Sequence, residues 1–132
     1  MTFGINGLDH FVLTVADSDA TCHFYGNILG MTIESFGDNR LAIRTGDQKI
    51  NIHVAGREFS PHAVKPLPGS GDFCLISSSP IATIILEIQA RGGVIESGPV
   101  ARTGATGPLL SIYLRDPDGN LVEIANKVPQ NG

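Results

Sequence analysis

Glu123 is the residue of this sequence whose chemistry most needs an explanation. The stretch from Leu110 to Asn126 consists of two alternating runs around Asp-Pro-Asp-Gly at 116–119. This pattern predicts strand, turn and strand, because proline and glycine supply the backbone angles of the turn. Glu123 is then a carboxylate in an otherwise apolar strand. A charge there is costly unless it is paired, hydrogen-bonded or bound to a metal, so we expect either a functional role or a salt bridge to Arg44 or Arg115.

His10 raises the same question near the start of the chain. It lies in Leu8–Val15, a run of apolar and β-branched residues that predicts a buried strand. A lone histidine in such a strand is often a core residue bonded to a backbone carbonyl. Whether His10 is structural or chemical therefore depends on where the other elements place it relative to Glu123.

The predicted elements run in the order strand, helix, strand, strand, strand, twice over. In the first half, the side-chain oxygens within Ala-Asp-Ser-Asp at 16–19 predict a helix cap, and apolar residues at helical spacing continue from 22 to 29. In the second half, Ser79-Pro80 predicts a cap and first turn for a helix that ends at Gly92-Gly93. The predicted strands are 8–15, 31–35, 39–45, 48–54, 72–77, 94–97 and the two strands of 110–126, with a glycine-rich loop at 98–107.

The two halves also share sequence. Thr-Ile-Glu-Ser at 32–35 reappears as Val-Ile-Glu-Ser at 94–97, and the same shift places His10 on Asp72. A slightly larger shift near the end of each half places Asn51 on Glu123. Positions of chemical interest therefore recur at matched places in the repeat.

These patterns predict one α+β domain over residues 1–132. Two tandem βαβββ modules, at about 6–55 and 72–127, are expected to form a cupped mixed β-sheet with the helices outside. The connector between them, about 56–71, is rich in proline, glycine and serine, the composition of a loop.

Composition excludes several functional classes. The net charge is -4, and no cluster of lysine or arginine predicts binding to nucleic acid or to an anionic membrane. No apolar run is long enough to span a membrane, and the first residues lack the basic and apolar regions of a secretory signal. The two cysteines, without metal-type spacing, fit reduced thiols in a cytoplasmic protein.

Three motifs carry a resemblance to a known family. They are Leu-Asp-His-Phe-Val-Leu-Thr-Val-Ala-Asp at 8–17, His-Phe-Tyr-Gly-Asn-Ile-Leu-Gly-Met at 23–31, and Leu-Arg-Asp-Pro-Asp-Gly-Asn-Leu-Val-Glu-Ile at 114–124. In this order they resemble the vicinal oxygen chelate superfamily, which includes glyoxalase I, extradiol dioxygenases, fosfomycin-resistance thiol transferases and bleomycin-binding proteins. Residues 46–53 and 99–108 are similar to the subgroup of glyoxalase domain-containing protein 5 and its bacterial relatives.

The resemblance implies a divalent metal in the cup, with Zn, Mn, Fe, Co or Ni as candidates. His10 and Glu123 match the first-strand and last-strand ligands of the family, and Asn51 and Asp72 fall on the remaining two ligand places. Metal-dependent relatives commonly have histidine where this chain has Asp72, which is otherwise simply an exposed residue at the end of the connector. His53 shares a strand face with Asn51 and is the alternative ligand.

Substrate contacts are expected on the second module. Tyr113 corresponds to a tyrosine that contacts substrate in relatives, and Ser111 shares its strand face. Tyr113 is alternatively a lining residue without a chemical part. Arg102, with Thr103 and Thr106 beside it, would recognise a carboxylate or phosphate if the glycine-rich loop is a binding loop, whereas a plain mobile lid is the alternative.

Two functions follow from this resemblance. The first is a metal-dependent enzyme of the glyoxalase and dioxygenase type, with Glu123 and Tyr113 as catalytic residues and a small oxygen-rich substrate. A lyase or isomerase is favoured over an extradiol dioxygenase, which needs further catalytic histidines. The second is a metal-free protein that binds a drug or metabolite in the cup. The resemblance implies a homodimer in either case, with modules paired within or between chains.

Overall fold

The computed structural model describes residues 3–130 and contains two βαβββ modules in tandem. The tandem α+β fold expected from the repeat is confirmed. In chain order the elements are β1 (His10–Val15), α1 (Ser18–Cys22), the π-helix η1 (His23–Ile28), β2 (Thr32–Phe36), β3 (Arg40–Thr45), β4 (Gln48–Val54), β5 (Asp72–Ile76), α2 (Ile81–Ala90), β6 (Ser97–Thr103), β7 (Pro108–Arg115) and β8 (Leu121–Lys127).

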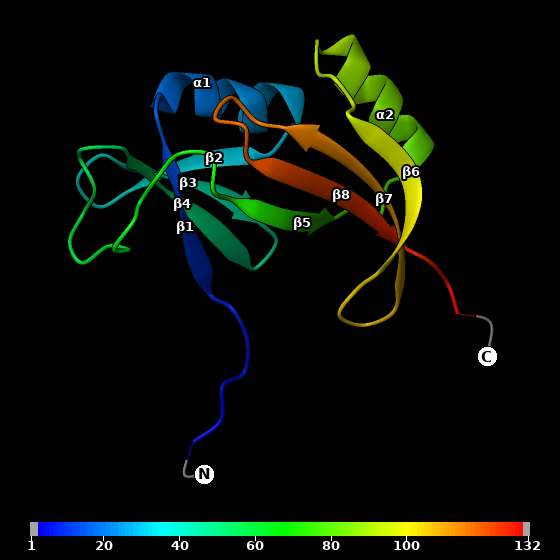
Figure 1. Cartoon of the computed structure of the whole chain (residues 1–132), viewed down its shortest axis with the longest axis horizontal. Helices are drawn as coiled ribbons and strands as arrows, with labels where there is room; N and C mark the ends of the chain where they lie inside the picture. Colours follow the sequence, from blue (N-terminus) through cyan, green and yellow to red (C-terminus); the bar gives the residue numbers. More distant parts are fainter. Residues whose placement is uncertain (1–2, 131–132) are drawn as a thin grey trace.

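The strands form two separate sheets of the same topology. The order is β1-β4-β3-β2 in the first sheet and β5-β8-β7-β6 in the second. In both sheets the first strand of the module pairs in parallel with the last, and the other pairs are antiparallel. Figure 1 shows α1 and α2 on one side of the two sheets, while residues 3–9 extend away on the other side.

The helices begin where side-chain oxygens satisfy their first backbone amides. Asp17 accepts from the amides of Asp19 and Ala20, as the sequence predicts. The Ser79 cap expected for α2 is wrong: the N-cap residue is Pro80, and the amide of Ile81 donates to the Asn126 side chain at 2.9 Å. Nothing in the local sequence indicates a cap supplied from β8, because the two segments meet only in the folded chain.

The strand expected at 94–97 and the loop expected at 98–107 are also wrong. β6 begins at Ser97 and continues to Thr103, and its register against β7 shifts between Ser97 and Val100. This β-bulge accommodates Gly98, whose φ of +101° favours glycine. The Gly-Pro pair looked like the start of a loop but is a bulge inside a strand.

A buried polar network joins the modules at the Asp-Pro-Asp-Gly turn. The Tyr25 hydroxyl donates to Asp116 Oδ2 at 2.7 Å, and the Asn120 side-chain amide donates to the same oxygen at 2.7 Å. The amide of Gly71, in the connector, donates to Asn120 Oδ1 at 2.7 Å. Phe11 of β1 packs edge-on against Phe73 of β5, with ring centroids 5.3 Å apart. Asp116 is therefore a structural carboxylate that fixes how the two modules meet.

No helix within residues 3–130 is long and apolar enough to cross a membrane.

Candidate metal and substrate site

Each sheet has one face on the hydrophobic core and one opposite face, which we call the open face. On β1 and β4, Leu13 and Ile50 point into the core, so His10 and Asn51 belong to the open face of the first sheet. On β8, Val122 and Ile124 point into the core, which places Glu123 on the open face of the second sheet. Asp72, two residues before Cys74 on β5, shares that face.

The four matched ligand positions form two equivalent diagonal pairs. His10 lies opposite Lys49, so Asn51 is its diagonal neighbour on β4. Asp72 lies opposite Leu121, so Glu123 is its diagonal neighbour on β8. Diagonal neighbours have Cβ atoms within about 7–8 Å, a spacing over which two side chains reach one ion. The repeat seen in the sequence is therefore also a repeat of geometry.

His10 is held by its sequence neighbour. Its Nδ1 is 2.7 Å from Asp9 Oδ1, and its side chain is 44% exposed, which is not the buried histidine of the structural interpretation. The hydrogen bond to His10, followed by the charge of its ring, lowers the pKa of Asp9. A carboxylate on one ring nitrogen fixes the tautomer and leaves the lone pair of Nε2 free to bind a metal, the arrangement common around metal-bound histidines. Asp9 is a site residue that we did not predict, although its adjacency to His10 was visible in the sequence.

Glu123 lies in the middle of a row across the second sheet. Its neighbours in register are Cys74 on β5 and Tyr113 on β7. Burial, and then the charge of Glu123 and a hydrogen bond with it, raise the pKa of the Cys74 thiol to about 11. Cys74 also borders a cavity of about 260 Å³ between β1 and β5 that His10 lines. Cys74 was not predicted, because nothing in its own segment marks it as facing a carboxylate.

The salt bridges proposed as an alternative for Glu123 are made by other residues. Arg44 donates to Glu34 at 2.7 Å, and Arg115 donates to Glu96 at 3.1 Å. The two pairs occupy equivalent places in the two modules. Neither guanidinium is paired with Glu123 among the described residues, so the structural interpretation of this carboxylate does not hold.

Asp72 is exposed at the first position of β5, where the connector ends. Its charge reaches Arg115: the hydrogen bond to Glu96 chiefly raises the pKa of that guanidinium, and the charge of Asp72 adds to this. Its carboxylate is therefore accessible on the open face.

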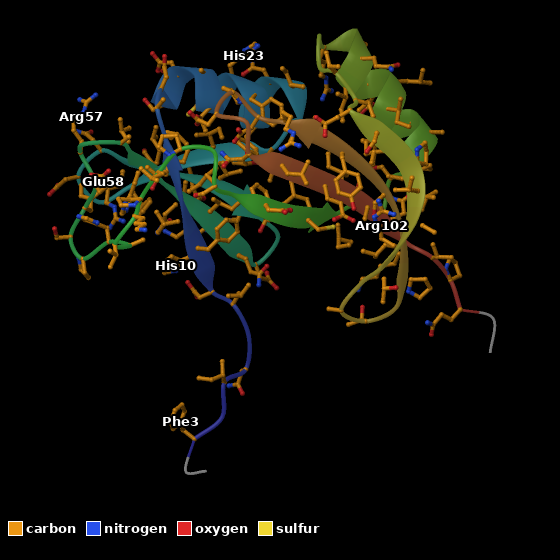
Figure 2. The ribbon with its side chains drawn as sticks, viewed as in Figure 1. Phe3, His10, His23, Arg57, Glu58 and Arg102 are labelled. Carbon is orange, nitrogen blue, oxygen red and sulfur yellow. The ribbon has the colours of Figure 1, made fainter. Side chains whose placement is uncertain are left out.

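Arg102 and Tyr113 form a pair on the open face of the second sheet. Arg102 lies in β6, and its Nε donates to the Tyr113 hydroxyl oxygen at 2.8 Å. Figure 2 shows Arg102 on this sheet and His10 on the other, at the end of β1 from which residues 3–9 leave. Thr103 also lies in β6, so only the turn around Thr106 remains of the predicted binding loop. Ser111 is fully buried, and its hydroxyl has no partner in the described structure.

His53 lies one pleat beyond Asn51 on β4 and is only 3% exposed. Its ring packs edge-on against Phe59 of the connector, with centroids 5.6 Å apart. Burial, and after it the charge of Arg40, lower the pKa of His53. The other two histidines, His23 and His62, are exposed.

The donor types fit a divalent metal, but one chain presents them as two half-sites. Within residues 3–130 no three histidine, cysteine or carboxylate side chains gather closely enough to hold an ion. The first sheet contributes His10 beside Asn51, whose buried Oδ1 has no partner, and the second contributes Asp72 beside Glu123. Nitrogen and oxygen donors of this kind suit the late divalent metals.

Comparison with known families gives an extensive match. The family described as the Glyoxalase/Bleomycin resistance protein/Dioxygenase superfamily matches residues 7–124. The chain is 51% identical over 124 residues to virulence protein STM3117 of Salmonella typhimurium, covering 94% of this chain and 86% of that protein. It is 48% identical over 122 residues to the glyoxalase domain-containing protein RDO1 of Mycosarcoma maydis, covering 92% of this chain and 69% of that protein.

Solved structures show the same fold. The crystal structure of the Salmonella virulence protein has a TM-score of 0.92 at 50% identity, covering 96% of this chain and all of that one (100%). At 19% identity, lactoylglutathione lyase from Agrobacterium tumefaciens has a TM-score of 0.70, covering 93% of this chain and 95% of that one. The antibiotic-binding protein TnmS3 from Streptomyces, also 19% identical, has a TM-score of 0.73, covering 96% and 99%. The last two show the fold alone, and one is named for a lyase while the other is named for binding.

Proposed function

Because the chain belongs to the Glyoxalase/Bleomycin resistance protein/Dioxygenase superfamily, we propose that it is a metal-dependent enzyme acting on a small oxygen-rich molecule. A lyase or isomerase reaction is favoured over an extradiol dioxygenase reaction. A dioxygenase needs additional catalytic histidines, and of the spare ones His23 and His62 are exposed while His53 is packed against Phe59.

The observation that carries this proposal is the matched pair of diagonals. His10 with Asn51 and Asp72 with Glu123 stand at equivalent places in the two sheets. A divalent metal held by His10, Glu123 and Asp72, with open positions, would bind neighbouring substrate oxygens and stabilise negative charge that develops on them.

We propose that a second copy of the chain completes the site. Within residues 3–130 no strand of one sheet pairs with a strand of the other, and each sheet presents one diagonal. A homodimer in which the first sheet of one protomer faces the second sheet of its partner would bring the two diagonals together. It would form two equivalent sites, as the symmetry of a two-fold dimer requires.

The protein groups have distinct tasks in this arrangement. Asp9 orients the His10 ring and keeps its proton on Nδ1. Arg102 donates to the Tyr113 oxygen, so the hydroxyl proton of Tyr113 is directed elsewhere and is available to a substrate oxygen. Glu123, in register with Tyr113, is the carboxylate placed to accept or return a proton at the substrate.

A second function is favoured because two of the expected metal ligands, Asn51 and Asp72, are weak ones. Asn51 and Asp72 stand where a glutamate and a histidine would make a stronger metal site, which suits a metal-free protein that binds a drug or metabolite in the cup. The two functions differ in what stabilises the protein: divalent ions stabilise the enzyme, whereas only organic ligands stabilise the binder.

Metal analysis tests the proposal. Protein purified without chelator and reconstituted with Zn²⁺, Mn²⁺, Fe²⁺, Co²⁺ or Ni²⁺ is expected to retain metal after desalting, and to unfold at a higher temperature. His10→Ala and Glu123→Gln are expected to lose the metal. His23→Ala, which alters an exposed histidine on η1, is the matched control and is expected to retain it. A wild-type protein that retains no metal after reconstitution rules out the enzyme.

Mixing the two variants tests the shared site. Co-refolded His10→Ala and Glu123→Gln chains form mixed dimers in which one site regains all its ligands, so part of the metal binding is expected to return. Mixed dimers that stay metal-free would show that each site is built within a single chain.

A further inference from the structure

Three polar side chains on the open face of the first sheet have buried atoms without partners. They are Nε of Arg40, Oδ1 of Asn51, and both ring nitrogens of His53. His53 is 3% exposed and Asn51 is 5% exposed. An unsatisfied buried polar group destabilises a folded protein, so a cluster of this kind calls for a ligand. The metal half-site formed by His10 and Asn51 leaves Arg40 and His53 unexplained.

The three side chains are neighbours. Asn51 and His53 alternate along β4 and therefore point to the same face. Arg40 begins β3, the next strand. Phe59 of the connector contacts both ends of the cluster, with its ring centroid 4.6 Å from the Arg40 guanidinium carbon and 5.6 Å from the His53 ring. We call Arg40, Asn51 and His53 the polar cluster, which Phe59 covers.

The second module shows that the fold does not require this cluster. The places that correspond to His53 and Arg40 are taken by Ala125 and Ser111, which lie opposite each other in the register of β7 and β8. Both are buried, and the sheet forms equally well with these small residues. The polar cluster is thus an addition specific to the first module and not a part of the repeated framework.

We propose that Arg40, Asn51 and His53 bind the carboxylate of a small organic acid. The Arg40 guanidinium supplies a fixed positive charge and planar donors that match a carboxylate. A neutral His53 offers one N–H donor, and the Asn51 amide supplies another donor in the orientation that the carboxylate selects. The positive charge of Arg40 next to His53 excludes a metal cation from the same place.

The surroundings of the cluster are consistent with an anion. Lys49 and Arg40 both lie over the Phe36 ring, with Lys49 Nζ 3.5 Å and the Arg40 guanidinium carbon 4.8 Å from its centroid. Lys49 therefore adds a second positive charge beside that of Arg40. Glu58, whose charge acts on His53, accepts from the amide of Gly56 at 2.9 Å. Phe59 is 40% exposed and belongs to the connector, so its movement opens the cluster without breaking a strand.

The polar cluster and His10 share one open face, so the carboxylate would belong to the substrate. This assignment of substrate class, an organic acid with a second oxygen function, rests on the proposed function. The binding of a carboxylate does not, because it depends only on the residues of the cluster.

Sodium acetate titrated into metal-free protein tests the site, with sodium chloride at equal ionic strength as the reference. Binding is followed by calorimetry and by the ¹⁵N signals of the His53 ring. Acetate is expected to bind and to move the His53 signals. Arg40→Gln is expected to weaken binding at least about tenfold, the loss of a charge-assisted hydrogen bond. Arg44→Gln is the matched control, since this arginine lies on the same strand and face but is paired with Glu34.

Asn51→Asp is the second variant, because it keeps the side-chain shape and repels a carboxylate, and is expected to abolish acetate binding. If Arg40→Gln does not fold, this variant and the His53 signals of the wild type still decide the matter. Equal effects of acetate and chloride, or unchanged binding in Asn51→Asp, would overturn the proposal. Because metal is removed throughout, failure of the metal site leaves this result unaffected, and failure of acetate binding leaves the metal analysis standing.

Discussion

Replacing Tyr25 with phenylalanine removes one hydrogen bond between the modules while keeping the ring. Tyr25 is fully buried, and its hydroxyl donates to Asp116 at 2.7 Å. Its ring packs edge-on against Phe24, with centroids 4.9 Å apart, and this contact survives the change. Asp116 keeps three other donors: the side-chain and backbone amides of Asn120 and the backbone amide of Asp118. The loss is therefore that of one hydrogen bond to a charged group, about 2 kcal/mol.

Urea unfolding monitored by circular dichroism measures this loss. The free energy of unfolding of Tyr25→Phe is expected to fall by about 2 kcal/mol, and the melting temperature by roughly 5–10 °C. Tyr113→Phe is the control, since its hydroxyl lies in a partly exposed pair with Arg102, and is expected to change stability by less than about 1 kcal/mol. A loss below about 0.5 kcal/mol in Tyr25→Phe would show that the Tyr25–Asp116 hydrogen bond does not hold the modules together.

Two further predictions concern the second module. Asn126→Ala removes the side chain that caps α2 at the amide of Ile81, so urea unfolding is expected to show a loss of about 1–2 kcal/mol, and an unchanged midpoint would contradict the cap. Cys74 has a pKa raised to about 11, so its thiol stays protonated at neutral pH and its alkylation by iodoacetamide is expected to accelerate up to about pH 11. Glu123→Gln lowers that pKa, so alkylation followed by mass spectrometry should speed up at pH 8; a slower or equal rate would place Glu123 away from the thiol.

The fold was predictable because its signals are local and occur twice. The helix cap predicted within residues 16–19 is supplied by Asp17, and the turn at 116–119 joins β7 to β8 as its proline and glycine predict. Prediction failed where the deciding contact comes from a distant segment. The cap of α2 comes from Asn126, and the strand through Gly98 and Pro99 is stabilised by pairing with β7, which local propensity does not include.

The candidate site was predictable in part. Strand alternation places His10 and Glu123 on open faces, and the repeat relates Asn51 and Asp72 to them. The sequence of one strand does not predict which residue of the neighbouring strand lies opposite each of its own. The position of Cys74 opposite Glu123 depends on the pairing of β5 with β8, whose sequence separation gives no indication of register.

The two modules share a framework and differ in what it carries. An ion pair occurs at the same place in both modules, as Glu34 with Arg44 and as Glu96 with Arg115. The two sheets are therefore alike at this place. The polar groups on the open faces differ between the modules. The second sheet presents carboxylates, a thiol and a tyrosine, whereas the first presents His10 and the polar cluster.

This difference between the two sheets would affect how a molecule between them is oriented. A molecule bound between two such faces meets different polar groups on its two sides, which favours one orientation over the other. Two identical faces would bind a molecule equally well in both orientations and would fix none of its atoms relative to Glu123. In the proposed enzyme, the first sheet would hold one end of the substrate, which would allow Glu123 in β8 to act on one defined atom at the other end.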